Sequence, residues 1–261
     1  MTILHALIFG LIEGITEFLP ISSTAHLIIT AKLLYLPDSA TLSSFLIAIQ
    51  LGAILSVAVL YTKTILKNPK LILKIAAAFI PTAIIGLLAY QLVKDYLLES
   101  LLTIAIALLL GGIVLIILEK YFARKTIKIS ETEESLGQLS YSQAVIIGVC
   151  QALAVIPGVS RSAATIMGGL ALKVSRKNIV EFSFLLALPT MLAATALDLY
   201  KSPPHLNDSG LITWGIGLIV AFITATLGIR FFLRYIKKHD FQAFGWYRII
   251  IGVIILLYLF I

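Results

Sequence analysis

Long apolar stretches separated by short polar ones dominate the chain. Six of them reach about twenty residues, the length that an α-helix needs to cross the hydrocarbon core of a bilayer. These stretches are Leu42–Thr62, Ile75–Val93, Ser100–Leu118, Ile179–Leu197, Ser209–Phe231 and Ala243–Ile261. The pattern therefore predicts an all-α integral membrane protein with six full crossings. The composition agrees, with 60% hydrophobic and only 13% charged residues.

Two further apolar stretches, residues 2–34 and 141–172, are interrupted near their middle. Leu-Pro-Ile-Ser-Ser at residues 19–23 interrupts the first, and Pro-Gly-Val-Ser at residues 157–160 interrupts the second. Proline ends one helix, and a following serine caps the next. Each piece is then about 12 to 17 residues long, too short to span a bilayer but suited to a half-helix. We therefore expect two re-entrant helix hairpins, each entering and leaving by the same face.

The basic residues are distributed as this topology requires. If both hairpins return to the face they entered, the loops near residues 32–40, 94–99 and 200–208 share one face. That face holds three basic residues, whereas the loops and helix ends of the other face hold fifteen. The three are Lys32, Lys94 and Lys201, and the fifteen are Lys63, Lys67, Lys70, Lys74, Lys120, Arg124, Lys125, Lys128, Lys173, Arg176, Lys177, Arg230, Arg234, Lys237 and Lys238.

The positive-inside rule places the fifteen basic residues in the cytoplasm, so both termini are expected to point outward. Topology thus accounts for the formal net charge of +7, and no nucleic-acid partner is needed. The chain is therefore expected to cross a membrane several times.

The two hairpins divide the chain into halves, each consisting of a hairpin and three crossings. Three is an odd number, so the halves, residues 1–121 and 141–261, must run through the membrane with inverted topology. The polar residues 122–140 between them are expected to form a cytoplasmic linker. Residues 10–25 (GLIEGITEFLPISSTA) align without gaps to residues 148–163 (GVCQALAVIPGVSRSA), which supports a repeat. Inverted repeats with broken helices place their site near the midplane, where the hairpin tips meet.

Acidic and hydroxyl side chains gather in the first hairpin. Glu13 and Glu17 are four residues apart, so a helix places both carboxylates on one face. Ionised groups are costly in a membrane, and two adjacent acids favour either a shared proton or a divalent cation. The alternative is that both acids are merely solvated near the outer interface. Ser22, Ser23 and Thr24 open the next half-helix, whose N-terminus attracts an anion.

His26 is expected to lie on the same helix face as Ser22 and Ser23. It could deprotonate a hydroxyl, protonate a leaving group or attack phosphorus itself. The alternatives are that the serines only cap the half-helix and that the histidine is structural.

Arg161 is the charged residue of the second hairpin, between Ser160 and Ser162 in the first turn of the following helix. The helix dipole opposes a cation there, which indicates an anionic partner, and the arginine fork binds two phosphate oxygens at once. The alternative, compatible with phosphate binding, is a structural pair between Arg161 and a glutamate of the first hairpin. In the alignment of the two hairpins, Arg161 occupies the position of Ser23. One half therefore supplies the acids and the other supplies the cation. This asymmetry favours one catalytic site over two equivalent transport half-sites.

Two further polar residues, Gln50 and Arg248, lie within predicted crossings. Gln50 lies mid-span and either reaches the site or bonds a neighbouring helix. Arg248 lies near the cytoplasmic end of the last crossing, so its side chain is expected to extend to the membrane interface.

At these residues the chain resembles the bacterial undecaprenyl-diphosphatases, also called bacitracin-resistance proteins. The resemblance rests on residues 13–27 (EGITEFLPISSTAHL), residues 157–162 (PGVSRS) and residues 49–52 (IQLG), and it extends over essentially the whole chain. It implies removal of the terminal phosphate from undecaprenyl pyrophosphate, which regenerates the monophosphate carrier for cell-wall synthesis. It also implies a location in the bacterial plasma membrane and an outward-facing site that depends on a divalent cation, Mg²⁺ or Ca²⁺. Ala25 and Ala163 depart from the glycine that is usual in the family at these places.

The resemblance also implies roles for individual residues. Glu13 and Glu17 would handle the metal or a proton, Ser23 and His26 would be the nucleophile and its partner in either order, and Arg161 would clamp the pyrophosphate. Substrate contacts are expected from the neighbouring polar residues Ser22, Thr24, Gln50, Ser160 and Ser162.

Two other functions fit the same pattern less well. A lipid-phosphate flippase or secondary transporter would use inverted repeats and a similar anion site, but only an enzyme releases phosphate in detergent. A structural scaffold would leave the polar residues within the membrane unexplained. The oligomeric state, a homo-oligomer included, stays open.

Overall fold

The computed structural model describes residues 1–93, 97, 100–126, 136–201 and 208–260. Every regular element within these residues is a helix, and six helices are long and apolar enough to cross a membrane. They are α3 (Ala40–Lys67), α4 (Pro69–Leu92), α5 (Leu101–Thr126), α8 (Arg176–Lys201), α9 (Asp208–Tyr235) and α10 (Gln242–Phe260). The prediction of an all-α fold with six helices able to cross a membrane is therefore confirmed.

The observed helices extend beyond the predicted apolar stretches. α3, for example, continues through Lys63 to Lys67, where the chain turns at Asn68 and α4 begins with Pro69 at its first position. Hydrophobicity marks only the part of a helix that matches the hydrocarbon core, whereas the polar ends stay helical beyond it. α8 likewise begins at Arg176, ahead of the predicted start.

Both interrupted stretches form two short helices with a break at the predicted place. The first contains α1 (Ile3–Thr16) and α2 (Ser23–Leu33). The second contains α6 (Tyr141–Ala152), a short 3₁₀ turn, η3 (Leu153–Val155), and α7 (Arg161–Ala171). We call residues 17–22 the first tip and residues 156–160 the second tip.

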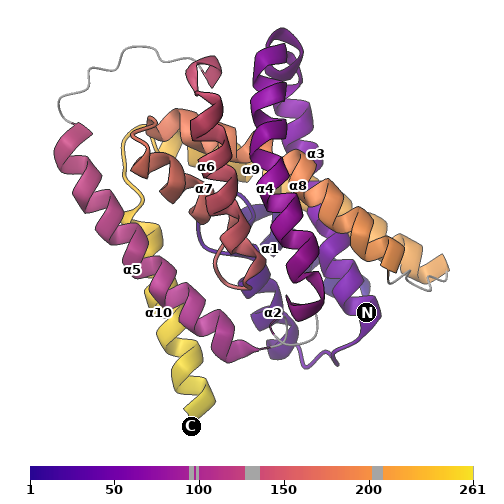
Figure 1. Cartoon of the computed structure of the whole chain (residues 1–261). Helices are drawn as coiled ribbons and strands as arrows, with labels where there is room; N and C mark the ends of the chain where they lie inside the picture. Colours follow the sequence, from indigo (N-terminus) through magenta and orange to yellow (C-terminus); the bar gives the residue numbers. More distant parts are fainter. Residues whose placement is uncertain (94–96, 98–99, 127–135, 202–207, 261) are drawn as a thin grey trace.

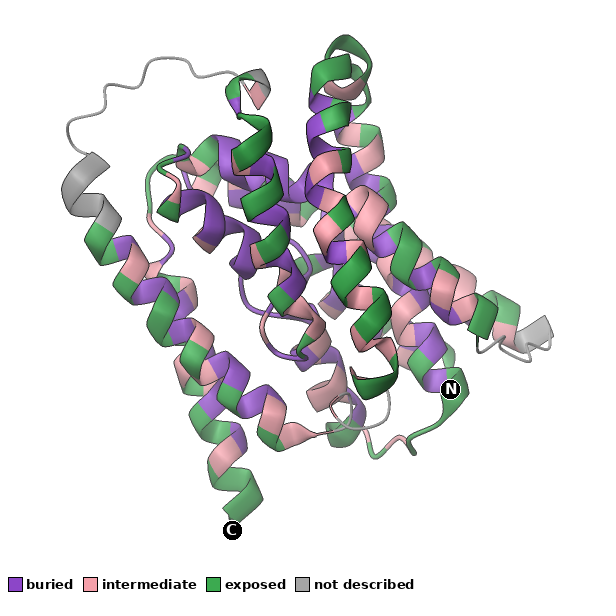
Figure 2. Ribbon diagram, viewed as in Figure 1, coloured by how far each residue is buried: buried purple, intermediate pink, exposed green. Residues whose placement is uncertain are grey.

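Helices of the two halves pack against one another rather than within separate bundles. α1 lies mainly against α9, α6 lies against α4, and α5 pairs with α10 along the opposite side (Figure 1). Apolar residues of α8, among them Phe182 and Phe184, belong to the largest buried cluster. Figure 2 places the buried residues at the centre, around the short helices, and the exposed ones on the outer faces of the long helices. This is the burial pattern of a bundle surrounded by lipid.

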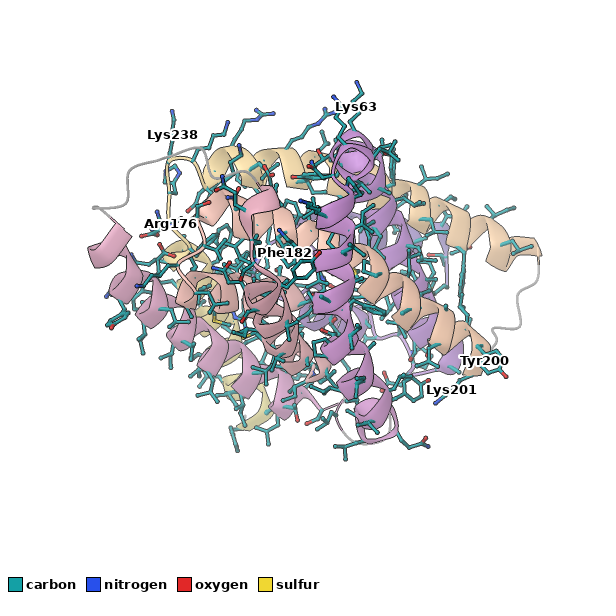
Figure 3. The ribbon with its side chains drawn as sticks, turned by 45° about the horizontal axis from the view of Figure 1, so that its top comes forward. Lys63, Arg176, Phe182, Tyr200, Lys201 and Lys238 are labelled. Atoms are coloured by element: carbon teal, nitrogen blue, oxygen red, sulfur yellow. The ribbon has the colours of Figure 1, made fainter. Side chains whose placement is uncertain are left out.

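Charged residues mark opposite ends of the bundle. Figure 3 places Lys63 and Lys238 toward one end, whereas Lys201 and Tyr200 lie toward the other. The middle of the predicted linker, residues 127–135 of 122–140, falls outside the described residues: α5 continues to Thr126, and the chain is described again from the 3₁₀ turn η2 (Leu136–Gln138). Lys94 also lies outside them.

Candidate functional site

The two tips share one local conformation. Ser22 and Ser160 are non-glycine residues with positive φ, 71° and 72°, and each directly precedes a helix. The Ser22 hydroxyl accepts from the backbone N–H of Ala25, and the Ser160 hydroxyl accepts from that of Ala163. Such conformations are strained for residues with a Cβ and concentrate at functional sites. Each serine therefore caps a helix whose N-terminus lies at a tip.

Direct contacts join the tips. The Ser162 hydroxyl, at the start of α7, donates to the backbone carbonyl of Leu19 at 2.8 Å. Within the second hairpin, the hydroxyls of Ser160 and Ser162 lie 3.2 Å apart. The bond from Ser162 to Leu19 holds the start of α7 against the first tip.

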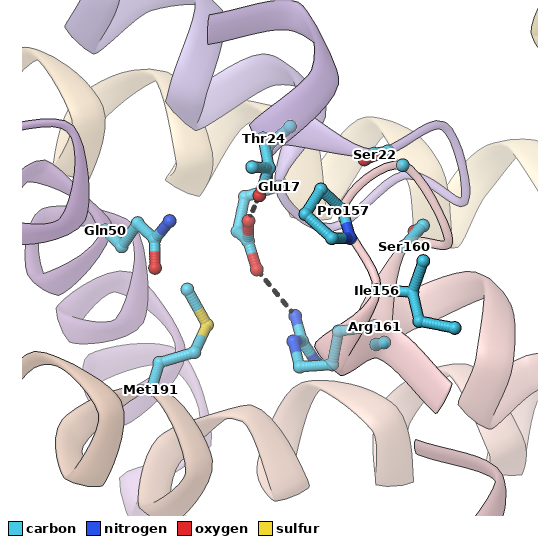
Figure 4. Close-up of a pocket in the computed structure, with 12 residues that line it drawn as sticks. Glu17, Ser22, Thr24, Gln50, Ile156, Pro157, Ser160, Arg161 and Met191 are labelled. Atoms are coloured by element: carbon cyan, nitrogen blue, oxygen red, sulfur yellow. Dashed lines mark hydrogen bonds and ion pairs between the residues drawn. The ribbon is translucent and has the colours of Figure 1, made fainter. Parts of the chain in front are cut away.

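Glu17 connects the candidate nucleophile to the candidate clamp (Figure 4). One oxygen of its carboxylate accepts from Arg161 Nη2 at 3.0 Å, and the other accepts a hydrogen bond from the Ser23 hydroxyl. Arg161 Nη1 donates to the backbone carbonyl of Ser183 in α8 at 2.8 Å, which holds the guanidinium from the other side. Within the described chain Arg161 Nε is buried without a hydrogen-bond partner. The arginine thus keeps donors beyond those that fix its position.

A cavity of about 150 Å³ lies between the tips, α3 and α8. Apolar side chains such as Ile156 and Met191 contribute to its wall. Seven residues predicted from the sequence also line it: Glu17, Ser22, Ser23, Thr24, Gln50, Ser160 and Arg161. The structure therefore brings most of the predicted site together in one place, with polar groups from both hairpins and from α3.

Glu13 lies beside this cavity without lining it. It is 0% exposed, and neither oxygen of its carboxylate has a hydrogen-bond partner in the part of the chain that the structure describes. It interacts electrostatically with Glu17 and Arg161. The alternative that both acids are solvated at the interface is wrong, because Glu17 is also buried. A buried carboxylate without a hydrogen-bond partner, next to a second carboxylate, is stabilised by a shared proton or by a bound cation.

The two acids fit a divalent cation only as part of its coordination shell. Carboxylate and hydroxyl oxygens suit Mg²⁺ and Ca²⁺. Among the described residues, however, no group of three His, Cys, Asp or Glu side chains could hold a metal alone. Mg²⁺ is commonly held by one or two carboxylates together with substrate phosphates, and the unpartnered oxygens of Glu13 fit that mode.

His26 and Ser162 do not line the cavity. His26 Nδ1 lies 2.7 Å from the carbonyl oxygen of Ser22, and Nε2 lies 2.7 Å from the hydroxyl of Tyr247 in α10. A carbonyl only accepts, so Nδ1 carries the proton and Nε2 accepts from Tyr247. The imidazole is thus engaged at both nitrogens, and its ring is stacked on that of Tyr247.

Arg248 contradicts the expectation that it extends to the membrane interface. Its side chain is 0% exposed and donates to backbone carbonyls of both tips. Sequence reasoning also missed Tyr247 and Ser183, which contact His26 and Arg161. The available signal for Arg248 was its distance from the helix end together with Gly111 and Gly112, small residues that leave space inside a crossing.

The chain is similar to known proteins over nearly its whole length. The chain matches the family described as bacitracin resistance protein BacA over residues 6–254. An undecaprenyl-diphosphatase of Wolinella succinogenes is 48% identical over 259 residues, which cover 99% of this chain and 99% of that protein. One from Aquifex aeolicus is 46% identical over 254 residues, 97% of each chain. One from Bdellovibrio bacteriovorus is 44% identical over 260 residues, 100% of this chain and 97% of that protein. The chain therefore belongs to the bacitracin resistance protein BacA family.

Proposed function

We propose that the protein is an undecaprenyl-diphosphatase, which removes the terminal phosphate of undecaprenyl pyrophosphate and leaves the monophosphate carrier lipid. The observation that carries this proposal is the chain of contacts from the Ser23 hydroxyl through Glu17 to Arg161 at the edge of a polar cavity. A nucleophile, a base and a phosphate-binding cation are the groups that phosphoryl transfer requires.

The size of the cavity supports a division of the substrate between two environments. About 150 Å³ of space suits a pyrophosphate group but not a polyisoprenyl chain. The tail would lie along exposed apolar surfaces of the long helices, in contact with membrane lipids.

Ser23 attacks the terminal phosphorus in this mechanism, and Glu17 takes the hydroxyl proton. The bond from that phosphorus to the bridging oxygen breaks, so undecaprenyl phosphate leaves and a phosphoserine forms. Glu17 then returns its proton as the carrier lipid departs and deprotonates the water that hydrolyses the phosphoserine. Inorganic phosphate leaves, and the serine is regenerated. The hydrogen bond between Ser23 and Glu17 favours the serine as nucleophile over His26.

Arg161 and the two helix N-termini stabilise the charge of the transferring group. The guanidinium is held by Glu17 and Ser183 in advance of substrate, so its remaining donors need no reorganisation. The first amides of α2 and α7 point at the same space, where the helix dipoles favour an anion. Ser22, Thr24, Ser160 and Gln50 would contact the pyrophosphate from the cavity wall, and Ser162 would act by holding the tips together.

Glu13 and Glu17 would hold a divalent cation, Mg²⁺ or Ca²⁺, together with phosphate oxygens of the substrate. When bound, the ion would neutralise charge on the pyrophosphate. Glu13 is placed to complete this role because its carboxylate is buried beside Glu17 and has no hydrogen-bond partner in the described chain.

Two inverted repeats, residues 1–121 and 141–261 joined by the linker 122–140, are our proposed architecture. Corresponding positions carry the same local features: α1 and α6 both begin with a capping box, and the residues after α2 and α7 include Tyr35 and Lys173 with positive φ. The packing is also reciprocal, since α1 lies on α9 and α6 lies on α4. The charge distribution supports a cytoplasmic basic face, with both termini and the site open to the outside.

Release of inorganic phosphate by the purified protein tests this function. The protein is incubated in detergent with undecaprenyl pyrophosphate, with Mg²⁺, with Ca²⁺ or with a chelator. Metal-dependent release is expected, together with its loss in Ser23→Ala. A matched control is Arg230→Gln, an exposed position in α9 away from the cavity, which should keep the wild-type rate.

A lipid-phosphate flippase is the second candidate, favoured by the reciprocal packing of the two halves. The same experiment separates the two. Folded protein that binds the pyrophosphate but releases no phosphate under any metal condition would support the flippase and overturn the phosphatase.

A further inference from the structure

Arg248 occupies the second turn of α10 and is fully buried. A guanidinium has five N–H groups, and here all five find backbone carbonyl oxygens. Nη1 donates to Pro20 and Val159 at 3.1 and 3.0 Å, Nη2 donates to Ala107 and Gly158 at 3.1 and 3.0 Å, and Nε donates to Leu108 at 3.4 Å. The side chain is therefore completely satisfied without a carboxylate among these partners.

These carbonyls belong to three segments of the chain, and Arg248 donates hydrogen bonds to all three. Pro20 lies in the first tip, just ahead of Ser22 and Ser23, and Gly158 and Val159 lie in the second tip, just ahead of Arg161. The remaining two carbonyls belong to α5. One side chain thus fixes the two tips to each other and to a membrane-crossing helix.

Glycines of α5 provide the space for this side chain. A Cβ on Gly111 would lie 2.2 Å from Nη2 of Arg248, and a Cβ on Gly112 would lie 3.1 Å from Cβ of Arg248. Gly158 in the second tip has φ +93°, and a Cβ there would lie 2.8 Å from the backbone oxygen of Ile104, so this glycine lets the tip approach α5. The guanidinium sits in a slot that larger residues would close.

The chemistry of the slot calls for arginine in particular. Burying a cation inside a membrane is costly, and an apolar side chain often packs a core equally well. An apolar side chain, however, cannot bond carbonyls from three segments at fixed angles, whereas the rigid fork of arginine can. The neighbouring Tyr247 reinforces the same attachment, because it bonds His26, which holds the carbonyl of Ser22.

We propose that Arg248 is a positioning residue for phosphoryl transfer: it binds the two tips in register, so that Arg161 faces Glu17 and Ser23. The proposal rests on the proposed function, since the reaction takes place between the tips. Arg248 itself does not line the cavity and acts through the residues that do.

Kinetics of folded variants provide the first test. Arg248→Gln should lower kcat for undecaprenyl pyrophosphate by about 10- to 100-fold with KM within about threefold, because misplacing reacting groups by about an ångström costs rates of this order. Arg248→Lys keeps the charge but not the fork and should recover only part of the loss. Gly111→Ala should lower kcat in the same way by displacing the guanidinium, whereas Gly86→Ala, where the added Cβ meets nothing within 4 Å, should not.

Hydrogen exchange of the full-length protein in detergent provides a test without catalysis. In Arg248→Gln, the amides of residues 19, 21–24 and 158–162 should exchange at least about tenfold faster, while those of α3 and α8 keep their wild-type protection. Arg230→Gln is the control and should change neither set.

The two readouts separate failure of this proposal from failure of the proposed function. Wild-type protein that releases no phosphate would refute the phosphatase, and tip exchange would still decide the role of Arg248. Unchanged kcat and unchanged tip exchange in folded Arg248→Gln would overturn the positioning role. If Arg248→Gln does not fold, Arg248→Lys and Gly111→Ala provide the test. Wild-type kcat together with wild-type exchange of the tip amides in both of these variants would also overturn the positioning role.

Discussion

The Glu17 carboxylate and the Arg161 guanidinium lie 3.0 Å apart, although 144 positions separate them in the chain. Both side chains are almost fully buried, and each has a further polar contact, to Ser23 and to the carbonyl of Ser183. Removing one partner of such a pair leaves an uncompensated charge. The pair therefore joins the two hairpins. It also holds Glu17, the proposed base, beside Arg161, the proposed phosphate-binding group, before substrate binds.

Arg161→Lys tests the need for the fork at this pair. Lysine keeps the positive charge beside Glu17 but binds phosphate as a point charge. We expect folded protein whose kcat falls by about 100-fold or more, a loss of the size seen when one preorganised donor is removed. Phosphate release in detergent measures it. A rate near that of the wild type would mean that charge alone suffices there.

A covalent intermediate on Ser23 is the next expectation. With pyrophosphate substrate labelled at the terminal phosphorus, rapid acid quenching should trap label on the wild-type protein and none on Ser23→Ala. His26→Gln should still become labelled, more slowly, because His26 bonds Ser22 and Tyr247 rather than facing the cavity. Label lost in His26→Gln and kept in Ser23→Ala would instead identify the histidine as nucleophile.

The local features of this fold were predictable from the sequence. Pro20 and Pro157 break the apolar stretches where the structure breaks them, and capping by Ser22 and Ser160 follows from the serines after them. Proximity of Glu17, Ser23 and Arg161 was also expected, because two tips that return to the midplane meet.

The contacts of α10 were not predictable in the same way. Tyr247 is 221 positions from His26, and no local pattern indicates that pairing. Arg248 was placed at the interface because a basic residue near a helix end usually extends to water. Its burial depends on the absent side chains of Gly111 and Gly112 and on two tips from other parts of the chain, which only the tertiary packing brings together.

Ser22 provides a test of backbone strain at the first tip. Glycine adopts a φ of 71° without penalty and substitutes for serine as an N-cap at a cost of only a few tenths of a kcal/mol, so Ser22→Gly should remain folded with nearly wild-type stability. Ser22→Ala keeps the strain and loses the cap, which should cost about 1 kcal/mol of stability. Thermal unfolding in detergent measures the difference. Equal midpoints for the two variants would argue against strain at this residue.

Glu13→Gln separates the two states open to the buried acid pair, a shared proton and a bound cation. The substitution keeps the shape of the side chain and removes one carboxylate of the pair. If Glu13 holds the cation, the Mg²⁺ concentration for half-maximal phosphate release should rise at least about tenfold, because affinity at oxygen sites follows the charge of the ligands.

A suitable control is Glu119→Gln, at a buried acid that pairs with Arg176 in a different part of the bundle. It should lower stability, because Arg176 loses its partner, and leave the Mg²⁺ dependence unchanged. If Glu13→Gln also leaves the Mg²⁺ dependence unchanged, Glu13 does not hold the ion. The pair would then be stabilised by a proton, and Glu13 would act by keeping Glu17 in the state that accepts the proton of Ser23.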